Sequence, residues 1–238
     1  RSFKSELIPY NAEGIDRVHI TPQNADSYTL VKENDAWKVD RGNRMYPANK
    51  SMVNRMLGQV ANLKVNQVVA TSPDSWNQYE VSDSLSTQVN ISSEGESVGL
   101  RIGKLNFDRQ TRSAVSYVRQ VGDDNVYGVD GFLKMSFSRG ADSYRRKTLV
   151  SLTKTSAVSQ ISFSYPADSS FVLRRNNNQW MIAGQVTDSA STAEYISSIK
   201  NLKGSTFASV EQPDLSNPTY RVTISGEQTI EVSAKKVA

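Results

Sequence analysis

The feature that most constrains this chain is a pattern that occurs twice. The stretches Arg17–Val39 and Gln160–Ile182 carry apolar and turn residues in the same order. At one fixed spacing the following residues coincide: Val18 and Ile20 with Ile161 and Phe163, Tyr28 with Phe171, Leu30 with Leu173, Asn34 with Asn177, and Trp37 with Trp180. After a short gap the agreement resumes, with Asn62-Leu63-Lys64 against Asn201-Leu202-Lys203. A repeat within a sequence indicates that one structural unit occurs more than once, so it constrains the fold class. The pattern indicates that an ancestral unit was duplicated.

Each copy begins with a predicted hairpin. Apolar residues alternate with polar ones before the turn, as they do in half-buried strands. Asn34 in the first copy and Asn177 in the second lie in short polar stretches whose residues tolerate a positive φ, so each stretch predicts a tight turn. The strand after the turn carries Trp37 or Trp180. We expect both tryptophans to lie in the core beside a helix.

A helix and two further strands follow in each copy. Apolar residues at helical spacing predict a first helix over 52–63, with Asn49 or Ser51 as its cap. In the second copy, Ser191 and Glu194 have the spacing of a capping box. The predicted strand pairs are 86–93 with 97–104, and 219–225 with 228–234. The expected fold class is therefore α+β, with two tandem βββαββ-like copies, each a strand-rich unit with one amphipathic helix.

An extra segment separates the two copies. A hairpin is predicted across the turn Gly122-Asp123-Asp124-Asn125, and a short amphipathic helix is predicted around 132–137. The expected organisation is an N-terminal tether at 1–14, a first repeat at 15–104, this inserted segment with its connector at 105–158, and a second repeat at 159–238.

Composition excludes several classes of protein. The 238 residues contain no Cys and a single His, which removes disulfides, thiolate nucleophiles and cysteine metal sites. No apolar run is long enough to span a bilayer. The formal net charge of +4 is a mild excess that is not concentrated in a stripe with interleaved aromatic residues, so we expect no nucleic-acid partner.

The search for catalytic chemistry finds no candidate constellation. His19 lies in a predicted strand and has no second His beside which it could bind a metal or act in a triad. The acidic run at Asp123-Asp124-Asn125 departs from the calcium-loop pattern, because Tyr127 and Lys134 occupy ligand positions. We expect no catalytic residue, no metal and no cofactor, and a protein that is not an enzyme. A hydrolase that uses carboxylates or serine is a remote alternative.

Two groups of residues are candidate contacts for a partner or ligand. Tyr46, Trp76 and Tyr79 lie in turn-like stretches, where aromatic side chains serve as sugar platforms or interface anchors, or else fold back onto the core as plugs. The second group is the basic run Arg145-Arg146-Lys147, which is either a contact for anionic groups or a solvated surface.

Several stretches together resemble a known family. They are the opening Arg1–Leu7, Ile15–Ile20, the Trp37 hairpin, the helix end at Asn62-Leu63, the Tyr117–Tyr127 hairpin with Val-Tyr-Gly-Val, and Arg145–Leu149. In these the chain is similar to an uncharacterised bacterial family classed only as a domain of unknown function. The resemblance implies a single N-terminal membrane helix before Arg1 and genes beside an ABC-type transport system related to gliding and export auxiliary proteins. It supplies no catalytic residues.

The resemblance and the residues lead to one expected function and one main alternative. We expect a non-catalytic extracytoplasmic accessory or binding domain, in the periplasm or cell envelope and tethered to the cytoplasmic membrane. Its partner would be a cell-envelope protein, such as a transporter subunit. The alternative is a module that binds carbohydrate or an envelope polymer through the loop aromatics.

Overall fold

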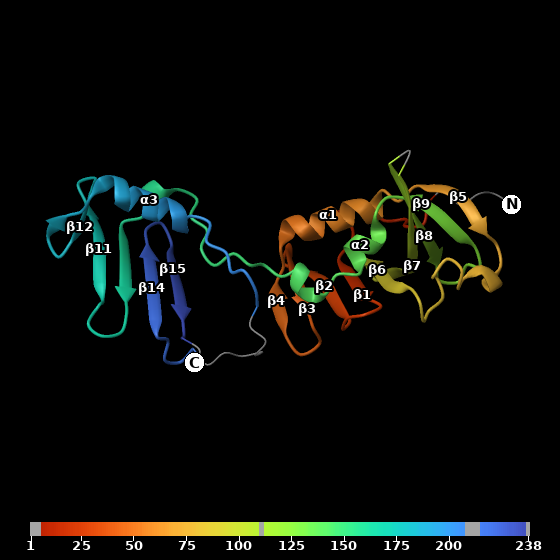
Figure 1. Ribbon diagram of the computed structural model, residues 1–238, viewed down its shortest axis with the longest axis horizontal. Coiled ribbons are helices and arrows are strands. Elements are labelled where there is room, and N and C mark those ends of the chain that lie inside the picture. The colour runs from red at the N-terminus through yellow and green to blue at the C-terminus, as the bar shows by residue number, and fades with distance from the viewer. Residues whose placement is uncertain (1–5, 110–111, 208–214, 237–238) are drawn as a thin grey trace. The chain divides into compact units, whose positions relative to one another are not determined.

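The computed structural model describes residues 6–109, 112–207 and 215–236. It divides the chain into two compact units, Arg1–Arg146 and Lys147–Ala238 (Figure 1), here called the first and the second unit. Residues 1–5 of the expected tether lie outside the described residues. Leu7 and Ile8, which belong to the same expected tether, are buried in the hydrophobic core of the first unit.

The first unit is built on a nine-stranded sheet. Its strands are β1 (Arg17–Thr21), β2 (Tyr28–Glu33), β3 (Ala36–Asp40), β4 (Met45–Pro47), β5 (Val65–Ala70), β6 (Thr87–Ser93), β7 (Glu96–Asp108), β8 (Ser113–Gln120) and β9 (Val126–Asp130). They lie in the order β4-β3-β2-β1-β6-β7-β8-β9-β5. Every neighbouring pair is antiparallel. Alternation of apolar and polar residues directs one face of strands such as β1 into the core.

Two helices contribute to the core of the first unit. The longer helix, α1 (Lys50–Ala61), buries Val53, Met56, Leu57 and Val60, which recur at helical spacing on one face. Asn49 caps it by accepting a hydrogen bond from the N–H of Met52 at 3.3 Å, so one of the two predicted caps is confirmed. The short helix α2 (Leu133–Phe137) buries Leu133 and Phe137. Single 3₁₀ turns lie at Pro73–Ser75 and Ala141–Ser143.

The second unit has a six-stranded antiparallel sheet and one helix. Its strands are β10 (Gln160–Ser164), β11 (Phe171–Asn176), β12 (Gln179–Ile182), β13 (Gln185–Val186), β14 (Tyr220–Ser225) and β15 (Thr229–Ala234), in the order β13-β12-β11-β10-β14-β15. A 3₁₀ turn lies at Thr155–Ala157. Helix α3 (Ser189–Ile199) lies on one face of the sheet, and of its residues only Thr192 and Ile196 are buried. The core of this unit is correspondingly small.

The prediction of an α+β fold is wrong. The described chain is mostly β, with 42% of its residues extended and 17% helical, in two antiparallel sheets with three α-helices. The predicted βββαββ-like unit does not include the strands β4, β5 and β13, because these strands are short or lack alternation of apolar and polar residues. The hairpin expected as an insertion within 105–158 is part of the first sheet, where it forms β8 and β9.

The two sheets nevertheless share an order of strands. The series β4-β3-β2-β1-β6-β7 of the first sheet has the same succession and the same antiparallel pairing as β13-β12-β11-β10-β14-β15 of the second. The pairing registers agree as well, since Val18 lies opposite Leu30 and Ile161 lies opposite Leu173. Positions in one sheet can therefore be compared with positions in the other, residue by residue.

Candidate functional site

The predicted loop aromatics of the first unit pack against other side chains. The ring of Trp76 lies face-on to Arg119, with 3.7 Å from the guanidinium carbon to the ring centre. The indole Nε1 donates a hydrogen bond of 3.0 Å to the carbonyl oxygen of Asp124. Tyr79 contacts the ring of Tyr117 edge-on, with their ring centres 4.7 Å apart. One face of Trp76 is therefore covered by an arginine, which weakens its case as a sugar platform.

The basic run is divided between the two units. Arg145 lies over the ring of Tyr46 at 3.7 Å, and its guanidinium forms a 2.9 Å ion pair with Asp142. Arg146 is exposed and donates its backbone N–H to the carbonyl oxygen of Pro47. Lys147, in the second unit, donates from Nζ to the carbonyl oxygen of Ser205 at 2.8 Å. Tyr46 and Arg145 thus come together, whereas Trp76 and Tyr79 belong to a different part of the first unit.

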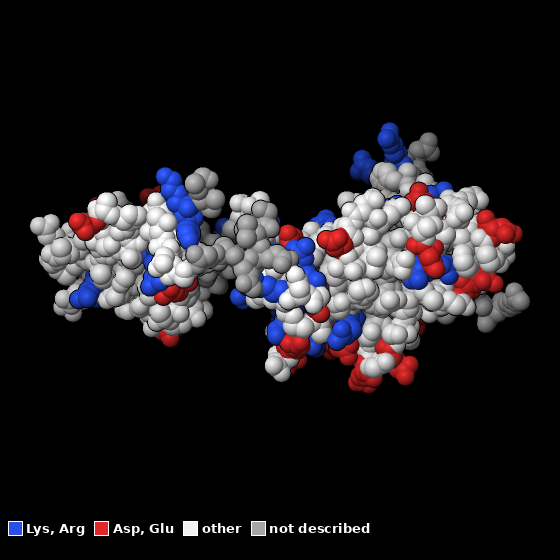
Figure 2. All heavy atoms as spheres, turned by 90° about the horizontal axis from the view of Figure 1, so that it is seen from below, with Lys and Arg blue, Asp and Glu red and all other residues white. Residues whose placement is uncertain are grey.

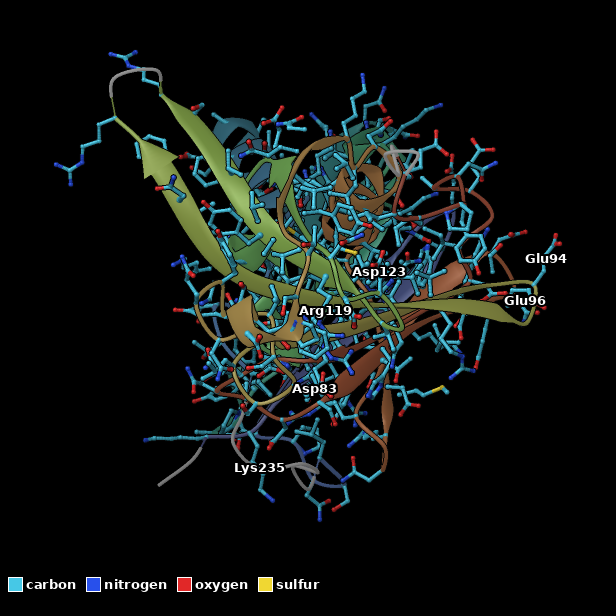
Figure 3. All side chains as sticks on the ribbon, turned by 90° about the vertical axis from the view of Figure 1, so that its right-hand side faces the viewer. Asp83, Glu94, Glu96, Arg119, Asp123 and Lys235 are labelled. Atoms are coloured by element: carbon cyan, nitrogen blue, oxygen red, sulfur yellow. The ribbon has the colours of Figure 1, made fainter. Side chains whose placement is uncertain are left out.

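One ionic cluster of the first unit joins a carboxylate to two arginines. Asp83 accepts hydrogen bonds from Nε of Arg101 at 2.7 Å and from a terminal nitrogen of Arg119 at 3.0 Å. Figure 3 shows Asp83 beside Arg119, with Glu94 and Glu96 at the far end of a hairpin. The hydrogen bond from Arg101 holds the pKa of Asp83 below its ordinary value. A general acid needs a raised carboxyl pKa, and the pKa of Asp83 is lowered. The cluster therefore has the features of structural ion pairs.

In the part of the chain that the structure describes, neither the distribution of charge nor the metal-ligand side chains give a second candidate. Figure 2 shows Lys and Arg interspersed with Asp and Glu on the displayed face of the first unit. Among the described residues, no three His, Asp or Glu side chains lie close enough together to hold a metal ion. His19 is half-buried and shares a hydrogen bond of 3.0 Å with the hydroxyl of Thr29.

The second unit contains an open apolar groove. It has a volume of about 370 Å³ and lies between helix α3 and the strands β10, β11 and β12. Its lining residues are Phe163, Tyr165, Phe171, Leu173, Ile182, Thr187, Asp188, Ser191, Thr192 and Tyr195. Asp188 is the one charged residue of this set. We call this feature the aromatic groove.

Stacked rings form the floor of the aromatic groove. Phe163 and Phe171 lie opposite each other on adjacent strands, and their rings stack with centres 4.3 Å apart. Tyr165 and Tyr195 each approach Phe163, with ring centres 5.8 Å from it. Phe171 and Tyr195 keep 37% and 38% of their surface exposed, although both are large apolar side chains. Exposed aromatic rings in a concave surface are typical of a site that buries part of a partner.

The rim of the aromatic groove carries one negative charge. Asp188 is the N-cap of α3 and accepts a hydrogen bond of 2.7 Å from the N–H of Ser191. This bond keeps the pKa of Asp188 below its ordinary value, so the carboxylate is charged at neutral pH. The predicted capping box is wrong, because the helix begins before Ser191, which donates to the cap. The arrangement places apolar rings beside an anionic rim.

Sequence reasoning missed the residues of the aromatic groove. A signal for them was available: Phe163, Tyr165 and Phe171 place three aromatic rings around one hairpin turn. A second signal lies in α3, which buries only Thr192 and Ile196, whereas α1 buries four apolar residues. A helix with so few apolar residues leaves part of its sheet uncovered.

Comparison with known proteins gives a family and no closer relative. No curated protein and no solved structure matches the chain. Within the described ranges, no helix combines the length and the apolar character that a membrane crossing requires. The model of one family, described as domain of unknown function (DUF4340), matches residues 37–221. Since this match covers well over half of the sequence, the chain belongs to that family.

Proposed function

We propose that this chain is a non-catalytic extracytoplasmic binding domain, tethered to the cytoplasmic membrane, that binds a protein partner of an ABC-type transport system. The observation that carries the binding role is the aromatic groove, where Phe171 and Tyr195 stay exposed in a concave, largely apolar site. When a partner covers such a site, the burial of apolar surface stabilises the complex by roughly 25 cal/mol for each Å² removed from water. The tether and the transport system come from the resemblance of the sequence to its family.

A protein partner fits the aromatic groove better than a carbohydrate does. Sugar sites pair aromatic faces with several polar groups that satisfy the hydroxyls, and the floor here consists of Phe163, Phe171 and Leu173. The loop tryptophan that favoured a sugar platform, Trp76, has one face against Arg119. The apolar floor favours an aromatic or aliphatic anchor residue of another protein.

The test is site-specific photo-crosslinking in living cells with the full-length protein. A photoreactive amino acid replaces Tyr195 in the groove or, as the matched control, Arg174. Arg174 is exposed and directs its side chain to the opposite face of the sheet from Phe171, on the same strand. The expected result is a crosslink from position 195 to an envelope protein that is encoded beside a transport system. No crosslink is expected from position 174.

Two outcomes contradict the proposal. Equal crosslinking from both positions would show that the groove has no special role. Fractionation that places the full-length protein in the cytoplasm would remove the extracytoplasmic location and the partner class with it.

A further inference from the structure

The first unit contains a covered version of the aromatic groove. In register, Phe163 corresponds to Ile20 and Phe171 to Tyr28, because each pair lies directly opposite on adjacent strands. The edge strands correspond too: the N–H of Ala48 donates to the carbonyl oxygen of Trp37 at 3.0 Å, and the N–H of Thr187 donates to that of Trp180 at 2.9 Å. The caps Asn49 and Asp188 follow directly.

A single segment covers this site in the first unit. The ring of Tyr144 lies 5.9 Å from the ring of Tyr28, and the hydroxyl of Tyr28 donates to the carbonyl oxygen of Arg139 at 2.8 Å. Both tyrosines are almost fully buried, and burial raises the pKa of Tyr144 to about 12. The covering segment thus places one aromatic side chain against the residue that corresponds to Phe171.

The same segment pairs with the sheet edge through its backbone. The N–H of Asn49 donates to the carbonyl oxygen of Tyr144 at 2.7 Å, and the N–H of Arg146 donates to that of Pro47 at 2.8 Å. These two bonds flank an antiparallel bridge between Ala48 and Arg145. After the 3₁₀ turn at Ala141–Ser143, the chain is thereby joined at Arg145 to the sheet edge that continues β4, and such backbone pairing at a sheet edge is the interaction that strand addition uses.

Within residues 147–207 and 215–236, nothing covers the corresponding groups of the second unit in this way. Val186 and Asp188 stand where Pro47 and Asn49 stand in the first unit. Outside the β12–β13 pairing, no described backbone group bonds to the carbonyl oxygen of Val186 or to the N–H of Asp188. Val186 is 55% exposed, in addition to the exposed rings of Phe171 and Tyr195. In the described part of the second unit, the edge and the groove together present an unfilled copy of the site that Tyr144 fills.

Charge indicates what kind of segment fits. In the first unit the residues after the buried tyrosine are basic, Arg145 and Arg146, and the cap beside them is the neutral Asn49. In the second unit the cap is Asp188, a carboxylate at the rim of the groove. An acidic rim attracts a basic segment and repels an acidic one.

We propose that the aromatic groove binds an extended segment of the partner protein in which an aromatic residue is followed by two basic residues. The aromatic side chain lies against Phe171 and Tyr195, and the segment pairs by strand addition with Val186 and Asp188. This inference rests on the proposed function and specifies the partner's chemistry.

The test uses a labelled peptide that copies residues 136–147 of this chain, the natural cover of the first unit. Its fluorescence anisotropy is measured against the full chain. We expect saturable binding with a Kd of roughly 100 μM, because the interface is small. Peptides with Tyr144→Ala, or with Arg145→Glu and Arg146→Glu together, should bind at least about tenfold more weakly.

Backbone pairing is tested with N-methylated peptides. Methylation of the Arg146 nitrogen removes the N–H that would donate to Val186, so binding should be lost. Methylation of the Arg145 nitrogen is the control, since that N–H is directed within the segment, to the carbonyl oxygen of Asp142 in the first unit. Equal binding of the two methylated peptides would contradict strand addition.

Variants of the full chain locate the binding site. Phe171→Ala and Tyr195→Ala should each weaken binding about tenfold, while Arg174→Ala should leave it unchanged. Asp188→Asn keeps a capping side chain, as Asn49 shows, and should reduce both the affinity and its dependence on salt. Circular dichroism identifies any variant that fails to fold. If one of the two groove variants does not fold, the affinity of the other groove variant tests the location of the binding site.

The inference is overturned if the peptide does not bind, or if the groove variants bind it as the unaltered chain does. Groove crosslinks to an envelope protein together with no peptide binding would leave the proposed function standing and remove the partner chemistry. Crosslinks from the groove to a second copy, or within the same chain, would overturn both.

Discussion

Tyr28 and Phe171 occupy the same register position in the two sheets, yet Tyr28 is 2% exposed and Phe171 is 37% exposed. Each lies directly opposite an apolar residue of the neighbouring strand. The difference arises because Tyr144 and the carbonyl oxygen of Arg139 cover Tyr28. Tyr28 is a core residue, and Phe171 is a partly exposed surface residue.

Truncation at these two positions should have unequal costs. Tyr28→Ala should destabilise the first unit by about 3–5 kcal/mol, because it empties a packed site and leaves the carbonyl oxygen of Arg139 without its donor. Phe171→Ala should destabilise the second unit by about 1 kcal/mol, since the ring is partly in solvent. Urea unfolding of each variant measures the free energies. Similar losses would mean that the two positions are equally buried in solution.

Trp76 is predicted to stabilise the first unit through Arg119. The side chain of Arg119 is 6% exposed, and its Nε donates to the carbonyl oxygen of Val81 at 3.1 Å. Trp76→Ala removes the ring over this nearly buried cation and should cost about 2 kcal/mol, whereas Trp76→Phe should cost less. Chemical denaturation provides the comparison. A glycan array should show no binding that Trp76→Ala abolishes, and such a loss would restore the sugar-platform interpretation.

Asp83 should make the stability of the first unit depend on acidity. Its folded-state pKa is lowered, chiefly by the hydrogen bond from Arg101, so its contribution is fully present above the ordinary carboxyl pKa of about 3.9 and is lost as pH falls through the folded value. Because the carboxylate is 69% exposed, screening limits the loss in Asp83→Asn to about 1 kcal/mol at pH 7.

The pH dependence separates this ionic contribution from a packing effect. Unfolding curves of the unaltered chain and of Asp83→Asn should differ at pH 7, and the difference should shrink as the pH falls below the ordinary carboxyl pKa of about 3.9. A difference that stays constant down to pH 2 would assign the effect of the substitution to packing.

Gly103 is predicted to be irreplaceable in strand β7. A Cβ atom at this position would overlap the carbonyl oxygen of Tyr79 and approach the side chain of Val81 at 2.8 Å. That carbonyl oxygen accepts a hydrogen bond from the N–H of Lys104 at 3.1 Å, so it cannot withdraw without loss. Gly103→Ala should therefore destabilise the first unit by about 2 kcal/mol.

The control for this substitution is a glycine inside helix α1. Nothing lies within 4 Å of a Cβ built on Gly58, so Gly58→Ala should stabilise the unit by about 0.5–1 kcal/mol through helix propensity. Thermal unfolding of the two variants tests both signs. A neutral Gly103→Ala would show that β7 can shift away from Tyr79.

Local turn and helix signals could be predicted from the sequence. The expected turns contain Asn34 and Asn177, with φ values of 47° and 45°, the left-handed region that asparagine tolerates. The first helix and its Asn49 cap follow from apolar spacing and from the short polar side chain before it. These features depend on residues near one another in the chain.

The fold class and the groove depend on residues far apart, which explains why they were missed. Strand β5 pairs with β9 across more than fifty residues, with two register shifts, so neither strand reveals the other. The edge strands β4 and β13 have three and two residues, too few for alternation to show. The exposure of Phe171 depends on segments elsewhere in the chain, and the few apolar residues of α3 are the sequence signal for it.

We infer that the second unit keeps open a site that the first unit covers, with Asp188 as its backbone donor. It is tested most directly by the amide chemical shift of Asp188 when the 136–147 peptide is added to the full chain. We predict a downfield, saturable shift of this amide signal, with the amide signals of Phe171 and Tyr195 shifting in parallel and that of Arg174 unchanged. Saturable binding that leaves the Asp188 amide where it was would contradict the account.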